Sequence, residues 1–371
     1  MISLLDLTLA DLTLFCAEEL GQSAFRARLI WKWIWQKRAG SFAGMSDLPL
    51  ELRSRLADAA SLERPQIAAR EESRDGTLKF LLRLADGAKV ESVLIPAPDG
   101  HLTLCLSCQV GCAMGCSFCG TGSLGFSRNM TCGEILSQVL LVRDFLGDSA
   151  PRLRNLVFMG MGEPLLNLRN VLRSLEIMGD DAGLGFSRRR ISVSTCGLPE
   201  GLAELGAGGL ASLTVSLHAP TQELRSALMP RAAAWPLPDL LAALRSYPLR
   251  ARERLTFAYL LLGGVNDSPE QARRLAGLLA PLKAKLNLIA YNPVPGLDFR
   301  PPDPEDVLNF ERILWASRIT VILRRSMGGD ISAACGQLVA GRNPRQATET
   351  PWGSAPNPAG GNDSPRTSSR E

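Results

Sequence analysis

Between residues 102 and 324 the chain alternates short apolar strands with helical segments, and this alternation constrains the fold more than any other feature. The strands are predicted at about 102–107, 155–159, 190–195, 212–217, 255–261, 286–290 and 319–324. Strands separated by helices favour parallel βα units. Six such repeats predict an α/β fold built on an open, partial (βα)6 barrel, in which chemistry takes place at the carboxyl ends of the strands.

Other patterns flank this core. Within residues 1–65, Ser/Thr start signals and Gly stop signals delimit three amphipathic helices, which predict a small N-terminal helical domain. The helices are expected over about 9–20, after residue 23, and over 50–60. Two alternating runs joined through Asp86–Gly87 predict a β-hairpin connection over 66–97. The core is then expected over 98–342, and the Pro-, Gly- and Ser-rich residues 343–371 are expected to form a disordered tail.

The composition limits the class of protein. A chain of 371 residues with 46% hydrophobic content can bury a large core. No basic stretch precedes an apolar one at the start, and no apolar run approaches about 18 residues, which predicts a cytoplasmic protein without a membrane span. Five of the nine cysteines lie between Cys105 and Cys119, a distribution typical of metal ligands and reactive thiols. The net charge of +4 permits a nucleic-acid partner without requiring one.

The loop after the first strand of the core carries Cys112, Cys116 and Cys119 in a C-x3-C-x2-C pattern. Iron–sulfur clusters are normally held by four cysteine thiolates, so a triplet leaves one iron of a [4Fe–4S] cluster for a ligand outside the protein. S-adenosylmethionine can chelate that iron through its amino and carboxylate groups and feeds radical chemistry. The spacing leaves open a zinc site that uses the same three cysteines and a fourth ligand.

Small and polar residues follow the other strands of the core. They are Gly160, Gly162, Glu163, Ser194, Ser216, His218 and Asn292, with the apolar Leu217 between Ser216 and His218. A glycine-rich turn lets the backbone approach a ligand, and a carboxylate beside it can accept hydrogen bonds from an amine. Serine and asparagine side chains suit the polar edges of a nucleoside, although at strand ends they are ordinarily caps or turn residues. A lone histidine is likewise more often a structural hydrogen-bonding group.

The second predicted helix interleaves basic residues with tryptophans. The basic residues are Arg26, Arg28, Lys32, Lys37 and Arg38, and the tryptophans are Trp31, Trp33 and Trp35. This mixture suits contact with phosphates and stacking on bases, and so predicts an RNA-binding surface. Tryptophans in a core beside a solvated charged face would give the same pattern.

Five segments together make the chain recognisable: Gln109–Cys119, Met159–Asn167, Ser216–Pro220, Tyr291–Pro293 and Asp330–Leu338. Over about residues 1–340 the chain resembles the radical SAM dual-specificity methyltransferases, which methylate carbon 2 of adenine in 23S ribosomal RNA and in tRNA. A related carbon-8 ribosomal RNA methyltransferase shares the cluster and both catalytic cysteines, and the N-terminal segment favours carbon 2. Outside this superfamily, a non-catalytic iron–sulfur or RNA-binding protein remains the alternative.

The resemblance implies a mechanism and its residues. Carbon 2 of adenine is electron-poor and requires a radical route, which consumes two S-adenosylmethionine molecules per methyl group. Cys335 is implied to carry an S-methylcysteine intermediate, and Glu91 to remove the carbon-2 proton as general base. Cys105 is implied to attack the sulfur of Cys335, which releases the product and leaves a transient disulfide.

The resemblance also implies the ligands and partners. The metal ligands are Cys112, Cys116 and Cys119, and the cofactor contacts are Gly162, Glu163, Ser194, Ser216, Leu217, His218 and Asn292. The implied partners are 23S rRNA, tRNA and a flavodoxin-type or other low-potential electron donor, with the chain a monomer. The sequence departs from the family at Cys108 and Cys196, where serine is more usual. Cys108 precedes Cys112 by four residues and can be mistaken for a ligand, whereas Cys16, Cys132 and Cys196 are expected to be structural. Gly328–Asp330 predicts a mobile loop that carries Cys335.

Overall fold

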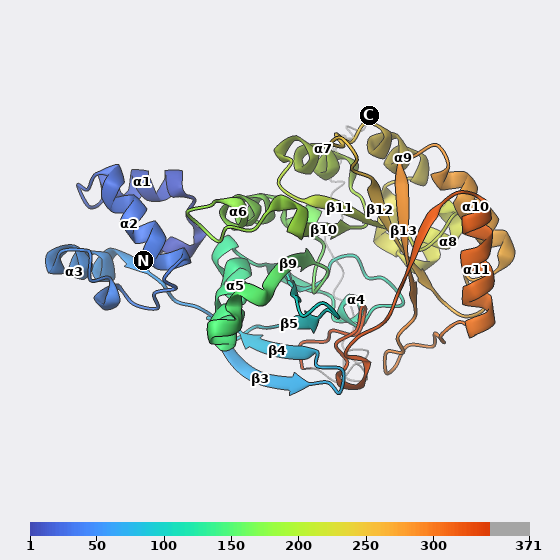
Figure 1. Ribbon diagram of the computed structural model, residues 1–371, viewed down its shortest axis with the longest axis horizontal. Coiled ribbons are helices and arrows are strands. Elements are labelled where there is room, and N and C mark those ends of the chain that lie inside the picture. Colours follow the sequence, from blue (N-terminus) through green and yellow to red (C-terminus); the bar gives the residue numbers. More distant parts are fainter. Residues whose placement is uncertain (342–371) are drawn as a thin grey trace, which may run out of the picture.

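A computed structural model describes residues 1–341, and its main element is a ten-stranded sheet (Figure 1). The predicted tail over 343–371 lies outside the described residues. Seven consecutive strands of this sheet pair in parallel. They are β6 (Leu102–Cys105), β9 (Leu153–Phe158), β10 (Ile191–Thr195), β11 (Ser212–Ser216), β12 (Leu255–Leu261), β13 (Ala284–Ala290) and β14 (Thr320–Arg324). These match the seven predicted strands, and the predicted α/β architecture with a partial barrel is confirmed.

Helices between these strands cover the outside of the sheet. They are α5 (Cys132–Leu146), α6 (Leu168–Gly179), α7 (Pro199–Gly208), α8 (Gln222–Leu228), α9 (Leu237–Arg245), α10 (Pro269–Leu279) and α11 (Pro304–Ala316). Local signals set their starts: Thr131 and Glu134 form a reciprocal capping box at α5, and proline occupies the first turn of α7, α10 and α11. Every residue of β12 is buried, as expected for a parallel strand with both faces covered.

Three antiparallel strands extend the sheet at one edge. They are β3 (Gln66–Glu72), β4 (Leu78–Arg83) and β5 (Lys89–Pro96), and β5 pairs with β6. The predicted hairpin at Asp86–Gly87 is present, but its strands continue the main sheet instead of forming a separate connection. In the register of this edge Lys79 lies opposite Val93, and Val93 lies opposite Cys105.

This register places three chemically important residues on one face. Directly opposed residues of antiparallel strands share a face, and so do residues two apart along a strand. Lys79, Val93 and Cys105 therefore share a face with Glu91, which lies two residues before Val93. The sheet extension thus carries a lysine and a glutamate toward the same side as the thiol of Cys105.

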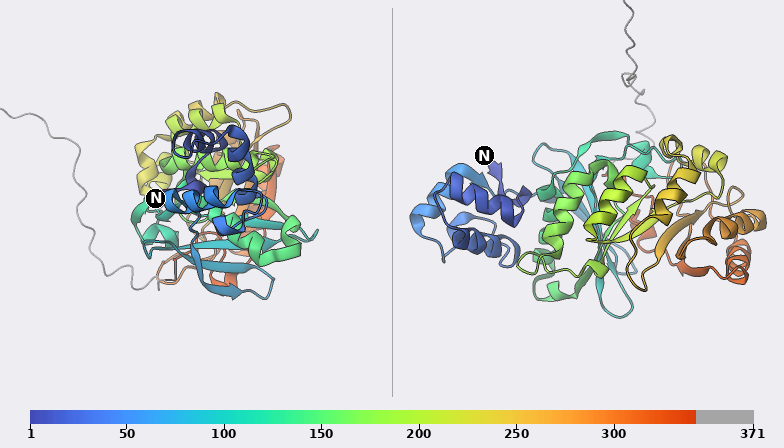
Figure 2. Two further views of the ribbon diagram at one scale, coloured as in Figure 1. Left: turned by 90° about the vertical axis from the view of Figure 1, so that its left-hand side faces the viewer. Right: turned by 90° about the horizontal axis from the view of Figure 1, so that it is seen from above.

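The N-terminal helical region consists of α1 (Leu9–Glu18), α2 (Ala24–Trp35) and α3 (Leu50–Ala59), with a two-stranded pair, β1 (Ile2–Ser3) and β2 (Ala60–Ser61). It lies at one end of the long axis, next to α5 and α6 (Figure 2). Trp31 and Trp35 are fully buried and pack edge to face at 5.6 Å. The expectation that these two tryptophans stack on bases is therefore wrong, whereas Arg28 and Lys32 remain exposed.

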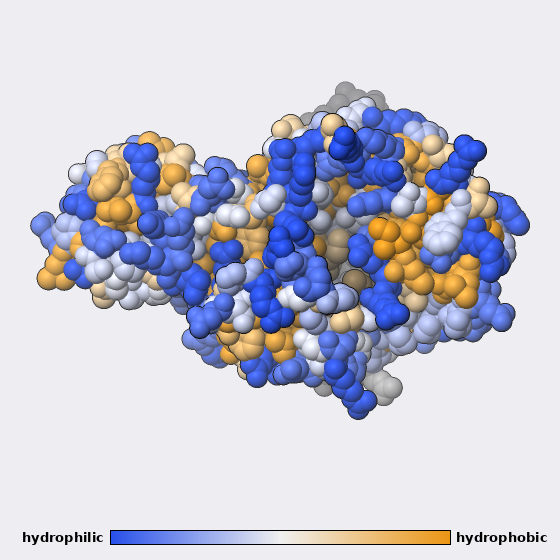
Figure 3. Space-filling view, viewed as in Figure 1, coloured by the Kyte–Doolittle hydropathy of each residue, from blue (hydrophilic) through white to orange (hydrophobic). Residues whose placement is uncertain are grey.

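Figure 3 shows that hydrophilic residues cover the middle of one face, with an apolar patch in the region of α11. The exposed large apolar side chains of this region include Leu308 and Trp315 of α11 and Ile322 and Leu323 of the edge strand β14. Within residues 1–341, no helix has the length and apolarity that crossing a membrane requires.

Candidate active site

The cysteine triplet lies on a tight loop after β7 (Gln109–Gly111), which pairs with β8 (Phe126–Asn129). The Cys112 amide donates to the Gly125 carbonyl at 2.8 Å, and the Cys119 amide donates to the Cys116 carbonyl at 3.2 Å. The loop then enters α4 (Gly120–Ser123), where a Cβ at Gly122 would lie 2.8 Å from the Cys116 oxygen. Only glycine permits this close return of the backbone.

The three thiols fit the donor set of a [4Fe–4S] cluster. Cys112, Cys116 and Cys119 form no disulfide and are half-buried against apolar side chains that include Phe118. Burial raises the pKa of Cys112 and of Cys119. Deprotonation of these thiols therefore needs a nearby positive charge, which a coordinated metal provides. Within residues 1–341, no three His, Cys, Asp or Glu side chains converge closely enough to hold a single metal ion.

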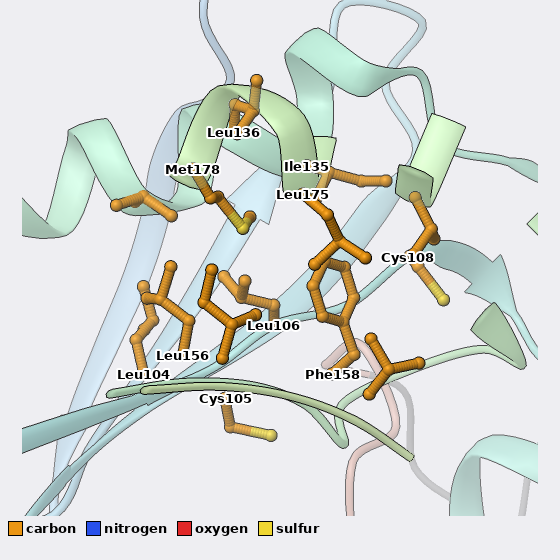
Figure 4. Close-up of a cluster of buried hydrophobic side chains, with 14 of the residues drawn as sticks. Leu104, Cys105, Leu106, Cys108, Ile135, Leu136, Leu156, Phe158, Leu175 and Met178 are labelled. Carbon is orange, nitrogen blue, oxygen red and sulfur yellow. The ribbon is translucent and has the colours of Figure 1, made fainter. Parts of the chain in front are cut away.

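Cys108 faces a different environment. Figure 4 shows it among the buried hydrophobic side chains that include Phe158, Leu175 and Ile135. The Cys108 carbonyl accepts a hydrogen bond from the Asn167 side chain at 2.8 Å. Burial raises the pKa of Cys108 well above its usual value. Its environment is that of a core residue.

Single serine substitutions should separate the cluster ligands from Cys108. We expect Cys112→Ser, Cys116→Ser and Cys119→Ser each to lose the bound iron, because two thiolates and one hydroxyl do not hold a cluster. Cys108→Ser should keep it and serves as the matched control. Iron and sulfide content, with the absorption spectrum of anaerobically purified protein, measures the difference. Loss of iron from Cys108→Ser would overturn the ligand assignment.

The glycine-rich turn after β9 packs directly against the turn after β6. A Cβ at Gly160 would lie 2.7 Å from the Leu106 oxygen, and one at Gly162 would lie 2.6 Å from the Gln109 Cβ. Gly162 also has a φ of +105°. Glycine at both positions is therefore a packing requirement.

Glu163, which follows this turn, is buried with both carboxylate oxygens hydrogen-bonded. Oε1 accepts from the Leu165 amide at 3.0 Å, and Oε2 accepts from the Cys196 amide at 2.8 Å. Burial raises the pKa of Glu163. The carboxylate joins the turn after β9 to the turn after β10, which positions the rim on which a cofactor would rest.

The other predicted rim residues come from neighbouring strand ends. Ser194 Oγ lies 3.2 Å from Ser216 Oγ, so β10 and β11 bring these hydroxyls together. The backbone of Leu217, whose side chain is buried, donates to the Ala258 carbonyl and accepts from the Ala219 amide. Asn292, after β13, donates from Nδ2 to the Cys335 carbonyl at 3.5 Å.

His218 links this rim to the cysteine loop. Its backbone has a φ of +58°, and its Nδ1 accepts a hydrogen bond from the Leu260 amide at 3.0 Å. Its ring packs edge to face on Phe118, at 5.1 Å between centroids. Burial lowers the pKa of His218 to about 3, so the ring is neutral at physiological pH. Its observed contacts are those of a structural hydrogen-bonding group.

Residues 328–341, here called the strap, carry Cys335 across the antiparallel edge of the sheet. At its start the Gly328 amide donates to Asp75 Oδ2 at 2.7 Å, and the Ile331 carbonyl accepts from Lys79 Nζ at 2.6 Å. At its end two strap amides, those of Val339 and Ala340, donate to Glu91 Oε2 at 2.8 and 2.9 Å. The segment that the glycines predict to be mobile is therefore anchored at both ends, with Cys335 exposed between the anchors.

The structure brings Cys105 and Cys335 close to each other. Figure 4 shows Cys105 pointing away from Leu104 and Leu106, toward the opposite face of the strand. Burial raises the pKa of Cys105, and the charge of Cys335 raises it further. Desolvation by surrounding protein raises the pKa of Cys335, and a backbone hydrogen bond and then the positive charge of Arg324 partly offset this rise.

The influence of Arg324 on Cys335 gives a test that needs no cofactor. Removing the cation in Arg324→Gln should raise the pKa of Cys335, because the thiolate loses a favourable charge interaction. Alkylation of Cys335 by iodoacetamide near neutral pH should then slow by up to about fivefold, since a solvent-exposed charge pair contributes at most about 1 kcal/mol. Peptide mass analysis across pH measures the profile, and Arg325→Gln is the control. An unchanged profile would remove Arg324 from the site.

Sequence patterns alone did not single out Lys79, which is only 6% exposed. Its Nζ lies 3.1 Å from Glu71 Oε1 and 3.6 Å from Glu91 Oε1, in addition to its bond with the strap. A buried ammonium needs such partners. The available signal was weak: Lys79 lies within the apolar strand Leu78–Arg83, on the face opposite to the buried Phe80 and Leu82.

Cys196, expected to be structural, lies beside the cysteine loop. It belongs to the buried cluster against which the three predicted ligands pack. A hydrogen bond with the Cys116 thiol, together with burial, raises the pKa of Cys196. Cys196 therefore contacts one of the predicted ligands, Cys116.

Comparison with known proteins gives two family matches. Residues 2–62 match the family described as "Ribosomal RNA large subunit methyltransferase N-terminal domain", and residues 106–276 match the family described as "Radical SAM superfamily". The second match spans the strands that carry the cysteine loop and the glycine-rich turn.

Curated relatives match over almost the whole chain. A protein of Nitratidesulfovibrio vulgaris named "Dual-specificity RNA methyltransferase RlmN" is 58% identical over 347 residues, which cover 92% of this chain and 95% of the relative. A protein of the same name from Geobacter sulfurreducens is 49% identical, covering 91% and 92%. The crystal structure of a radical SAM methyltransferase from Sphaerobacter thermophilus superposes with a TM-score of 0.86 at 42% identity, covering 92% of this chain and all of that one.

Proposed function

The chain belongs to the family of dual-specificity RNA methyltransferases RlmN, and we propose that it methylates carbon 2 of adenine in 23S ribosomal RNA and tRNA through an S-methylcysteine at Cys335. The observation that carries the proposal is the meeting of four groups at one site. One side of the sheet carries all four: the exposed thiol of Cys335, the buried thiol of Cys105, the carboxylate of Glu91 and the cysteine loop.

Cys112, Cys116 and Cys119 would hold the [4Fe–4S] cluster, and the rim formed by Gly162, Glu163, Ser194, Ser216, Leu217, His218 and Asn292 would bind S-adenosylmethionine. When bound, these two groups supply the methyl carbon and the radical that activates it. Two hydrogen bonds join the strap to α4, the helix that directly follows the cysteine loop. The Gly120 amide donates to the Gly336 carbonyl at 2.7 Å, and Thr121 Oγ1 donates to the Leu338 carbonyl at 2.7 Å.

Cys335 is the methyl acceptor because it is the exposed thiol of the site. Its thiolate takes the methyl group, and Arg324 favours that thiolate. The strap then presents the sulfur-linked carbon to carbon 2 of the adenine. One hydrogen atom leaves this carbon before its bond to carbon 2 forms, and that bond joins RNA and protein covalently through Cys335. When carbon 2 then loses its proton, one electron also leaves the adduct, which the one-electron chemistry of a bound cluster would accept.

Glu91 is positioned to take the carbon-2 proton. Its carboxylate is buried, and Lys79 Nζ lies 3.6 Å from Glu91 Oε1. The oxygen that receives the Val339 and Ala340 amides holds the strap at the same time. Uptake of a proton by Glu91 weakens its hold on the strap, because a neutral acid is a poorer acceptor than a carboxylate.

Cys105 releases the product. Its sulfur forms a bond with the sulfur of Cys335 while the bond from Cys335 to the methylene carbon breaks, and the electron pair stays on that carbon. The carbon gains a proton and becomes the methyl group, whereas the two thiols have become a disulfide. A dithiol reductant must then restore both thiols. Burial keeps Cys105 protonated until this stage.

The proposal also includes the partners. We infer a low-potential one-electron donor of the flavodoxin type or another kind, and a monomeric enzyme. Analysis of nucleosides by mass spectrometry, on rRNA and tRNA from a strain that lacks the gene and from the same strain complemented, tests the function. The expected result is 2-methyladenosine that appears only with the gene. Methylation at carbon 8, or an unchanged nucleoside profile, would overturn the proposal.

A further inference from the structure

A cavity of about 720 Å³ lies at the junction between the N-terminal helical region and the barrel. Four arginines line it, together with the single carboxylate of Asp148. They come from four separate elements: Arg38 follows α2, Arg143 lies on α5, Arg154 on β9, and Arg190 directly before β10. Residues at the start of β9 and β10 lie at the amino ends of these strands, so the cavity is at the opposite end of the barrel from the methylation site.

The guanidinium groups of this cavity have few acidic partners. Arg38 pairs with Asp144, at 2.6 Å. None of the ion pairs within residues 1–341 involves Arg143, Arg154 or Arg190. Arg154 contacts a ring nitrogen of His101 at 2.6 Å, and Arg190 donates to Asn155 at 3.3 Å. The cavity therefore carries an excess of positive charge.

Arg143 is held in place before any ligand arrives. Its Nη2 donates to the Leu184 carbonyl at 3.0 Å, and its guanidinium lies over the Phe186 ring at 4.6 Å. Burial and then the nearby positive charge of Arg38 lower the pKa of Arg143 to about 10. A bound anion would relieve this repulsion, and the fork of a fixed guanidinium matches the oxygens of a phosphate.

The cavity is linked through the chain to the basic residues of the N-terminal helical region. Arg38, which lines it, ends the basic segment that includes the exposed Arg28 and Lys32 of α2. The volume exceeds what one phosphate fills, and the arginines stand on separate elements around an open space. Successive phosphates of a nucleic-acid backbone fit this arrangement better than a single small anion does.

From this geometry we propose that the arginine-lined cavity binds the phosphate backbone of the RNA substrate, at a place remote from the adenine that is methylated. The inference rests on the proposed RNA methyltransferase function and adds a second contact region to it. Binding energy is then supplied by RNA outside the active site, and the RNA is held in register while its adenine reaches Cys335.

Neutralising the cavity tests this proposal on the full-length protein. The test variant is R143Q/R154Q/R190Q, and the control is R245Q/R273Q/R312Q, which removes the same charge from exposed positions on α9, α10 and α11. Fluorescence anisotropy with labelled tRNA and a labelled 23S rRNA fragment measures affinity from low to about 0.2 M salt. Melting temperatures confirm folding, and the double variant R154Q/R190Q replaces the triple if Arg143 proves necessary for stability.

We expect the test variant to bind RNA about 10- to 100-fold more weakly near 0.15 M salt, with the slope of log affinity against log salt reduced by about 2. The control variant should change the RNA affinity and the salt slope by much less. In methylation assays the KM for RNA should rise by a similar factor, with a far smaller effect on kcat. If the test and control variants lose RNA affinity equally, the effect is one of net charge alone, and the proposal is overturned.

A second arm separates RNA from a small anion. Inorganic phosphate is titrated while the melting temperature is followed. If phosphate stabilises the wild type and not the test variant, while RNA affinity is unchanged, the cavity holds a small anion and the proposal is wrong. Absence of methylation by the wild type would instead defeat the proposed function, and the binding comparison would still report on the cavity.

Discussion

Replacing Cys105 with alanine is expected to produce an enzyme that attaches itself covalently to its RNA and turns over no further. In the proposed mechanism Cys105 acts only after the carbon–carbon bond has formed, so Cys105→Ala should still methylate Cys335 and still add to carbon 2. Without a second sulfur the link through Cys335 stays intact. Multiple-turnover methylation should fall by about 10⁴-fold or more, as is usual when one member of a covalent catalytic set is removed.

Denaturing electrophoresis with labelled RNA measures the attached species, and peptide mass analysis locates it. The matched control is Cys335→Ala, which should give neither methylated protein nor attached RNA. The double variant should behave like Cys335→Ala, because the earlier step is lost. Normal turnover by Cys105→Ala would show that the nearby thiol is not the group that resolves the intermediate. Methylation of adenine by Cys335→Ala would end the covalent mechanism.

Replacing Glu91 with glutamine is expected to block release by another route and to loosen the strap. The amide cannot accept the carbon-2 proton, so attached RNA should accumulate while product release slows by about 10²–10⁴-fold, the usual contribution of a general base. The Val339 and Ala340 amides lose a charged acceptor, which contributes about 1.5–3 kcal/mol per bond. Their hydrogen exchange should accelerate about 10-fold or more.

The exchange measurement separates the two roles of Glu91, because it needs neither cofactor nor RNA. Glu71→Gln is the matched control: Glu71 also pairs with Lys79 but is exposed and makes no bond to the strap. The control should leave exchange in the strap and release of RNA unchanged. If attached RNA accumulates while hydrogen exchange in the strap is unchanged, Glu91 acts only as a base. If exchange accelerates while no attached RNA accumulates, Glu91 is only a structural anchor.

The strands and the cysteine loop were predictable because their signals are local. The alternation of strands with helices and the spacing of Cys112, Cys116 and Cys119 each lie within short segments, and the structure reproduces the strands closely. The tryptophans of α2 show the limit of such signals. Helical spacing cannot tell whether the face that carries Trp31 and Trp35 meets solvent or core, and here it meets the core.

The contacts that organise the site join residues far apart in the chain. Glu91 and Val339 are 248 residues apart, and Ser73 and Asp330, which also share a hydrogen bond, are 257 apart. Nothing in either segment identifies its partner. Lys79 was missed for the same reason, since its role depends on Glu91 and on the strap. The arginine-lined cavity likewise gathers residues from four separate elements.

The strap is synthesised after the other parts of the candidate site. The cysteine loop and all seven parallel strands precede the strap in the chain, so they emerge during synthesis before Cys335 does. A nascent or prematurely terminated chain can therefore contain every proposed cluster ligand and still lack Cys335, the proposed methyl acceptor. Such a chain also lacks the strap groups that contact Glu91 and Lys79, so these two buried side chains keep their ion pair but lose their hydrogen bonds to the strap. We expect such a chain to be digested by proteases faster than the complete protein, because the edge of its sheet is held by fewer contacts.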